Sequence, residues 1–299
     1  MGGAPRTTRP CRTAGTAGRW FLRLVDDEAI RRHAATRFRS EYDYALFEYW
    51  RSAKLLRWLG RAGLERLGRV LDDGCGGGGM CVSIAEETEL VVGIDLHTRF
   101  AEAGTRVARE RGVANLAFVQ SDGCRLPFPD GTFDTVLSHA VIEHVVDYRA
   151  YLRDAYRVLR PGGRMFLQTA PVLSPSGSHL PRLKARVPLH LLVGRRAAYA
   201  ASRWIAANRP HWIDTPPEGS SFLTAARDGR LKVDDVTYRV TIRSLRRAIR
   251  GSGLRIVRED LRVSSLARRC LPERVAALLP AVPFARDLLV TNMEYLLAR

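Results

Sequence analysis

The chain has 299 residues, of which 46% are hydrophobic. This is enough for one large domain, or one domain with an insertion, and most of the chain is expected to fold. Its five cysteines are scattered and form no C-x-x-C pair, which argues against a disulfide framework and against a cysteine zinc site. The formal net charge is +17, and only three of the 48 basic residues are lysines. Arginine suits phosphates and other anionic groups. We nevertheless favour the interpretation that the positive charges are spread over solvated faces, rather than gathered in a dedicated polyanion site.

The N-terminal part of the chain is expected to precede the main domain. Residues 1–19 are rich in Gly, Ala, Thr, Pro and Arg, which predicts a disordered basic tail. This end lacks the apolar core of a secretory signal, and no apolar run in the chain is long enough to span a bilayer, so we expect a cytoplasmic protein. In residues 20–66, apolar and aromatic residues recur at helical spacing from Ser40 onward, which predicts N-terminal helices.

Short apolar segments alternate with helical patterns in residues 67–170. The expected strands are 69–72, 90–95, 116–120, 133–138 and 164–169, and the expected helices are about 80–87, 99–111 and 148–159. Strands that alternate with helices indicate βαβ crossovers and a parallel sheet covered on both faces. The sequence therefore predicts an α/β core.

The alternation stops after this core. Seven prolines punctuate residues 171–217, and we interpret residues 171–239 as a helical cap insertion that contributes to the substrate site. The core pattern resumes in residues 240–299, with an expected helix at 242–250 and strands at 254–263 and near 290–297. These elements are expected to complete the sheet.

A glycine-rich turn follows the first core strand. That strand ends in Asp72, and Gly74, Gly76 and Gly78 come before the next helix, which is typical of a nucleotide-binding turn because glycine accepts φ > 0 and lets a ligand approach the backbone. With Gly79 the run also satisfies G-x-G-x-x-G, so a dinucleotide-binding dehydrogenase is an alternative. Asp95 ends the next strand, 19 residues past Gly76, in position to accept both ribose hydroxyls, as both alternatives require.

Motifs further along the chain separate these alternatives. They are residues 121–123 (SDG), 126–134 (LPFPDGTFD), 142–145 (IEHV) and 157–164 (RVLRPGGR). With the glycine turn, they resemble the class I S-adenosylmethionine-dependent methyltransferases of the ubiquinone/menaquinone-biosynthesis-like group (methyltransferase type 11), over roughly residues 66–171. The resemblance implies a Rossmann-like, doubly wound, seven-stranded sheet whose last strand is antiparallel, with S-adenosylmethionine as the cofactor.

The resemblance also implies a role for each matching residue. The methionine portion of the cofactor would be held by Asp72 and by the backbone of Gly74, Cys75, Gly76 and Gly78. Asp95 would bind the ribose hydroxyls, and Leu96 would pack on the adenine. Asp122, with the backbone of Gly123, would accept from the adenine amino group. Ser138 and His139 would line the methionine and sulfonium end.

The residues that assist methyl transfer are less defined. His144, expected at the start of the helix after the fourth strand, is the first candidate for a general base, and His139 is the second. His144 could instead form part of a metal site with Glu143, but no further ligand lies upstream, so we predict no metal. A third interpretation is that His144 only hydrogen-bonds the start of the helix.

The sequence thus predicts methyl transfer to a small molecule. We favour O-methylation of a lipid-linked, sugar, quinone or secondary-metabolite acceptor. The alternatives are an RNA methyltransferase, suggested by the charge of +17, and a non-catalytic cofactor-binding protein. No RNA-binding module is recognisable, so no specific nucleic acid is expected. Arginine doublets beside apolar helices, such as Arg195–Arg196 and Arg246–Arg247, suggest peripheral contact with an anionic membrane instead.

Overall fold

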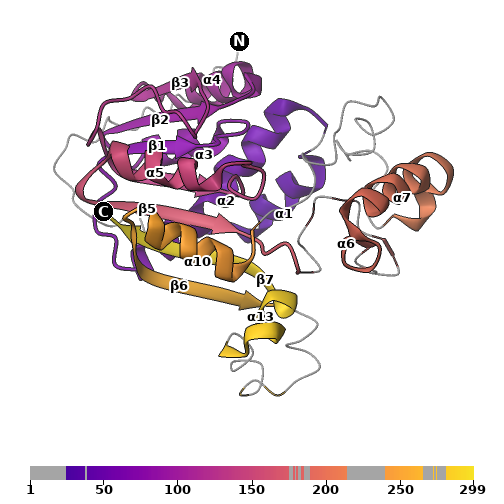
Figure 1. Ribbon diagram of the computed structural model, residues 1–299. Coiled ribbons are helices and arrows are strands. Elements are labelled where there is room, and N and C mark those ends of the chain that lie inside the picture. The colour runs from indigo at the N-terminus through magenta and orange to yellow at the C-terminus, as the bar shows by residue number, and fades with distance from the viewer. Residues whose placement is uncertain are drawn as a thin grey trace, which may run out of the picture.

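A seven-stranded sheet organises the chain (Figure 1). The computed structural model describes residues 25–37, 39–174, 178, 180, 183–184, 189–213, 240–264, 272, 274 and 281–299. The strands are β1 (Arg69–Asp73), β2 (Leu90–Asp95), β3 (Leu116–Gln120), β4 (Phe133–His139), β5 (Leu159–Thr169), β6 (Arg255–Val263) and β7 (Val290–Ala298). Their order in the sheet is β3-β2-β1-β4-β5-β7-β6.

The strand directions confirm the predicted doubly wound fold. The strands from β1 to β5 pair in parallel, and β7 lies antiparallel between β5 and β6. β1 pairs with β2 on one side and with β4 on the other, so the strand order reverses at β1. In open α/β sheets, ligands bind at such a reversal, outside the carboxyl ends of the strands.

Helices cover both faces of the sheet. They are α2 (Glu41–Arg61), α3 (Gly79–Ala85), α4 (Arg99–Arg111), α5 (Tyr148–Val158) and α10 (Ile242–Gly251). Helix α1 (Asp27–Thr36) packs on α2, and α13 (Pro283–Leu289) directly precedes β7. Successive residues of a strand point to opposite faces: Val136 of β4 packs in the core cluster that includes α5 and α10, and Leu137 packs in the one that includes α2 and α3. Helix α2 therefore forms part of the core.

One boundary differs clearly from the prediction. β5 begins at Leu159, five residues before the predicted start at Arg164, because Leu159 already pairs with Phe133 of β4. Arg160 precedes Pro161, and a residue before proline is driven away from helical backbone. The motif at 157–164 therefore carries the end of α5 and the beginning of β5.

Part of the predicted cap is described. It contains α6 (Leu189–Leu192), α7 (Gly194–Asn208) and the 3-10 turn η2 (Pro210–Trp212), with a small apolar cluster around Ile205 and Ile213. Figure 1 shows α6 and α7 to one side of the sheet, beyond the end toward which β5 points. That this segment covers a substrate remains a prediction. The predicted disordered tail, residues 1–19, lies outside the described residues, and every helix within them is too short or too polar to span a bilayer.

Candidate cofactor and active site

The glycine loop joins β1 to α3 at the carboxyl edge of the sheet. Gly74 has φ +91°, in the left-handed region that favours glycine, and a Cβ atom there would lie 2.2 Å from Cγ2 of Val141. At Gly79 a Cβ atom would lie 1.7 Å from the carbonyl oxygen of Ala45 in α2. The glycines are therefore required both by the turn and by the close approach of its neighbours.

The amides of the loop fasten it to β2. The N–H groups of Gly74 and Cys75 each donate to the carbonyl oxygen of Ile94 over 2.8 Å, and Gly78 N–H donates to the Cys75 carbonyl over 2.9 Å. The side chain of Cys75 is buried. These three amides are thus used within the protein, and the loop would meet a ligand through its open backbone rather than through these donors.

Asp95 lies where the loop meets the end of β2. Its Oδ2 accepts from the Gly76 amide over 3.1 Å, and its Oδ1 accepts from the His97 amide over 2.9 Å. A carboxylate oxygen has room for a second donor, so both oxygens can still receive a ribose hydroxyl. Leu96, next along the chain, is 60% exposed, so its side chain is accessible for packing on an adenine ring.

Asp122 and Gly123 follow β3 on the same edge of the sheet. Asp122 is exposed, and its Oδ1 accepts from the Cys124 amide over 2.8 Å, which fixes the carboxylate and leaves Oδ2 for a ligand donor. A Cβ atom on Gly123 would lie 2.5 Å from Oδ1 of Asp73 and 2.6 Å from the Tyr151 ring. Gly123 is therefore packed against the core and holds Asp122 at the end of the sheet.

The last two residues of β1, Asp72 and Asp73, have buried carboxyl groups. Oδ2 of Asp72 accepts from the Cys81 thiol over 3.1 Å, whereas Asp72 Oδ1 and Asp73 Oδ2 have no hydrogen-bond partner among the described residues. Burial raises the pKa of Asp72 to about 6 and the pKa of Asp73 well above its ordinary value. An unsatisfied buried carboxylate fits a cationic partner, so Asp72 has the chemistry that the predicted contact with the ammonium group of the cofactor requires.

Ser138 belongs to a buried hydroxyl network. Its Oγ accepts from the Tyr151 hydroxyl over 2.8 Å, and that hydroxyl also lies 3.4 Å from the Asp73 carbonyl oxygen. Ser138 is fully buried. Its predicted part in lining the methionine end stays a prediction, since its side chain is engaged inside the core.

Helix α2 carries two charged residues that the sequence analysis missed, Glu48 at the loop and Arg51 beside His139. Glu48 is 6% exposed, its Oε2 lies 3.4 Å from the Gly79 amide that donates to it, and a Cβ atom on Gly76 would lie 2.9 Å from its Oε1. Burial raises the pKa of Glu48 to about 8, and the positive charge of Arg51 opposes that rise. The sequence did contain a signal for these residues: Glu48 and Arg51 are three residues apart, on an otherwise apolar face of the predicted helix.

The two candidate histidines differ in their surroundings. His139, at the end of β4, has Nδ1 3.5 Å from Nη2 of Arg51, and burial with that charge lowers its pKa to about 3. At neutral pH this ring is uncharged and a weak base. His144 is half-buried and lies in the turn after β4, where its amide donates to the Val141 carbonyl over 2.9 Å.

The predicted position of His144 at a helix start is wrong. α5 begins at Tyr148, and the side chain of Asp147 caps it by accepting from the Arg149 and Ala150 amides. The turn is therefore a separate element between strand and helix. Glu143 beside it is buried, accepts from the Thr169 hydroxyl over 2.8 Å, and has its pKa raised to about 7 by burial. In the part of the chain that the structure describes, no group of three or more His, Cys, Asp or Glu side chains could hold a metal ion.

Comparisons with known proteins find methyltransferases. Residues 71–167 match the family of methyltransferase domains. The uncharacterized methyltransferase YcgJ of Bacillus subtilis (strain 168) is 34% identical over 128 residues, 41% of this chain and 50% of that protein. A demethylmenaquinone methyltransferase of Geobacillus sp. (strain WCH70) is 30% identical over 117 residues, 37% of this chain and 50% of that protein. The chain thus matches about half the length of these relatives.

A solved structure gives the same result for the fold. The crystal structure assigned as a sarcosine dimethylglycine methyltransferase from Galdieria sulphuraria has a TM-score of 0.50 at 15% identity, covering 83% of this chain and 84% of that one. The motifs, the strand order and the family match lead to one conclusion. Residues 71–167 match the methyltransferase-domain family, this part of the chain is similar to the class I methyltransferases of the menaquinone-biosynthesis-like group, and the cofactor that the match implies is S-adenosylmethionine.

Proposed function

We propose that this protein transfers the methyl group of S-adenosylmethionine to an oxygen atom of a small-molecule acceptor. One observation carries the proposal: the carboxyl ends of three adjacent strands carry the glycine loop, Asp95 with Leu96, and Asp122, in the order in which the cofactor presents methionine, ribose and adenine. A dehydrogenase would share the first two features. The third belongs to the methyltransferase pattern.

The chain offers complementary groups to both ends of the cofactor. At the nucleoside end, Asp95 would accept from the two ribose hydroxyls, and charge-assisted hydrogen bonds of this kind are the strong ones. At the methionine end, the unsatisfied carboxylate of Asp72 suits the ammonium group. Arg51 of α2, which lies beside His139, suits the carboxylate.

A sulfonium methyl group, once bound, is already electrophilic, so the protein must mainly hold an acceptor oxygen in line and accept its proton. We favour His144 as the base, because the pKa of His139 near 3 leaves that ring weakly basic. His139 then serves as a neutral wall of the site. Glu143, with a pKa of about 7, is a second group able to take up a proton near neutral pH.

The proposed acceptor is a lipid-linked, sugar, quinone or secondary-metabolite hydroxyl compound. Support for a quinone comes from the name of the Geobacillus relative, a demethylmenaquinone methyltransferase. The test is three separate reactions, each with the protein and methyl-labelled S-adenosylmethionine. The first contains a metabolite extract, the second a lipid extract and the third total RNA. The proposal predicts label in the first or second extract and its loss in Asp95→Ala. Label in RNA alone would contradict it.

A further inference from the structure

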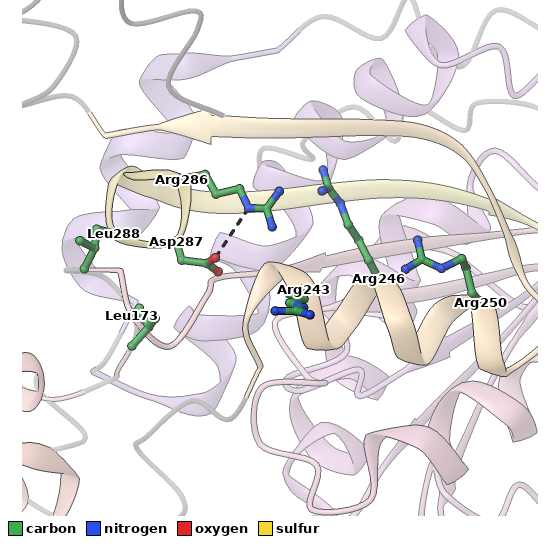
Figure 2. Close-up of a pocket in the computed structure, with 7 residues that line it drawn as sticks. All are labelled: Leu173, Arg243, Arg246, Arg250, Arg286, Asp287 and Leu288. Atoms are coloured by element: carbon green, nitrogen blue, oxygen red, sulfur yellow. Dashed lines mark ion pairs between the residues drawn. The ribbon is translucent and has the colours of Figure 1, made fainter. Parts of the chain in front are cut away.

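A hollow of about 660 Å³ lies away from the glycine loop, beside α10 and α13 (Figure 2). Its lining comes from three distant parts of the chain: Leu173, Arg243, Arg246, Arg250, Arg286, Asp287 and Leu288. The Val172 amide donates to the Val240 carbonyl over 2.8 Å, which ties the segment after β5 to the start of α10. The Leu173 end of the hollow therefore lies near the carboxyl end of β5, and the hollow extends from there along α10.

The sequence of α10 explains why its arginines gather there. The helix buries Ile242, Leu245, Ala248 and Ile249 against the core, which turns the positions between them outward. Arg243, Arg246 and Arg250 are spaced three and four residues apart, so they share one face. Like charges at this spacing destabilise a helix, and α10 contains no acidic residue of its own to offset them.

Acidic neighbours balance only part of this charge. Arg246 forms a two-pronged ion pair with Glu259 of β6, with Nε 2.7 Å from Oε1. Asp287 accepts the Ile242 amide at the start of α10 over 2.9 Å, and its other oxygen lies 3.7 Å from Nε of Arg286. Arg243 and Arg250 have no ion pair with any described residue, so the described lining, with four arginines and one carboxylate, carries an excess of positive charge.

Arg286 adds a donor that faces inward. Its side chain is 16% exposed, and its buried Nε makes no hydrogen bond to any described residue. Figure 2 shows its guanidinium group turned toward Arg246, from the opposite side of the hollow. A buried guanidinium with an unsatisfied N–H group is costly unless an acceptor reaches it, which points to an anion between Arg286 and α10.

The other end of the hollow is apolar. Leu173 is 42% exposed and Leu288 is 45% exposed, and Figure 2 shows both at the end away from Arg250. A simple inorganic anion would use only the arginines. A ligand that also covers these leucines must carry a hydrocarbon part next to its charged group.

We propose that this hollow binds the phosphate group of an amphipathic phosphate ester, with the hydrocarbon chain of the ester on Leu173 and Leu288. Arginine matches phosphate because its planar fork donates two parallel hydrogen bonds. A membrane phospholipid and a freely dissolved lipid-linked metabolite share this chemistry. The site is separate from the cofactor loop, and the proposal does not depend on methyl transfer.

The test is calorimetric titration of the full chain with octyl phosphate below its micelle concentration, with inorganic phosphate, and with octyl glucoside. Octyl phosphate is expected to bind at least about tenfold more tightly than either of the other two, because it alone meets both ends of the hollow. The double variant Arg243→Gln/Arg250→Gln should weaken octyl phosphate binding by about tenfold or more. Leu173→Ala should weaken octyl phosphate but not inorganic phosphate.

Matched controls test whether the effects on octyl phosphate binding are specific to residues of the hollow. Arg109→Gln changes an exposed arginine of α4, near the opposite edge of the sheet, and should leave octyl phosphate binding unchanged. S-adenosylhomocysteine binding, measured on the same samples, should be equal in all these variants, so that failure of this proposal and failure of the methyltransferase proposal give different results. A loss of cofactor binding in the double variant would show that the hollow is not independent, and would overturn the proposal.

Flotation with vesicles of phosphatidylcholine, with and without phosphatidic acid, distinguishes a membrane phospholipid from a dissolved lipid-linked metabolite as the ligand. Binding to vesicles that contain phosphatidic acid, lost in the double variant, indicates a membrane phospholipid. Binding to octyl phosphate without such flotation indicates a dissolved ester. The proposal is wrong if octyl phosphate binds no better than octyl glucoside, or if wild type and the double variant bind phosphate-bearing ligands equally.

Discussion

The backbone amide of Gly76 donates to a carboxylate oxygen of Asp95 over 3.1 Å. The residue proposed to bind the ribose therefore also holds the glycine loop in place. The loop and the nucleoside end of the site are one hydrogen-bonded unit, completed by the two amides that donate to the Ile94 carbonyl. Changes at either end should affect binding of the whole cofactor.

The first prediction concerns the shape of the loop. Gly74→Ala should destabilise the protein by about 1–3 kcal/mol, because its backbone is left-handed and the new methyl group would collide with Val141. Cofactor binding should fall as well. Gly251→Ala is the matched control, since a Cβ atom there meets nothing within 4 Å, and it should leave stability unchanged or raise it by about 0.4–1 kcal/mol. Urea unfolding measures both variants, and equal stabilities would contradict the account.

A second prediction follows from the buried carboxyl of Glu48. Its pKa is raised from 4.5 to about 8, so the folded chain holds this proton more tightly than the unfolded chain. Its contribution to stability is complete below the unfolded pKa and is lost as the pH rises through about 8. The side chain that Glu48→Gln introduces cannot ionise. The free energy of unfolding of this variant, relative to that of wild type, should therefore rise by more than about 1 kcal/mol between pH 5 and pH 8.

Urea unfolding of the cofactor-free protein at several pH values measures this difference. Glu102→Gln, at an exposed position of α4, is the control and should follow wild type at every pH. A constant difference between Glu48→Gln and wild type would mean that Glu48 does not titrate in this range.

A third prediction tests the proposed base. His144→Ala should lower turnover by roughly 10²–10⁴-fold if its ring accepts the acceptor's proton, with little change in the affinity for S-adenosylhomocysteine. His139→Ala should lower turnover less, because the pKa of His139 near 3 makes it a weak base. Unchanged turnover in His144→Ala, together with a lower melting temperature, would show a structural role for this residue.

Asp122 gives a fourth prediction, confined to the adenine end. Asp122→Ala should weaken binding of S-adenosylhomocysteine by about tenfold, through loss of one charge-assisted hydrogen bond. A cofactor analogue without the exocyclic amino group should bind wild type and the variant equally. If the analogue also bound the variant tenfold more weakly, Asp122 would not contact that amino group.

The features that sequence predicted well are local ones. The strands of the core are short apolar runs beside turn residues, and the residues after β1, β2 and β3 form ordered motifs. The core strands and the candidate cofactor residues could therefore both be located from the sequence pattern. The end of α5 was harder, because pairing of Leu159 with Phe133 decides it.

The features that sequence missed depend on tertiary contacts. Glu48 meets the glycine loop only because α2 packs on α3, with the Gly79 position against Ala45. The hollow combines Leu173, three arginines of α10 and Arg286, which are far apart in the chain. The arginine doublets indicated an anionic partner, but no pattern showed which of them share one cavity.

The most direct test of the account is calorimetric titration with S-adenosylhomocysteine and with NAD, on wild type and on Asp95→Ala. Wild type should bind S-adenosylhomocysteine in the micromolar range and should not bind NAD. Asp95→Ala should bind it at least about tenfold more weakly, because charge-assisted hydrogen bonds to two ribose hydroxyls, each worth about 1.5–3 kcal/mol, are lost. Tight binding of NAD, or equal affinity of wild type and Asp95→Ala for S-adenosylhomocysteine, would contradict the assignment of this site.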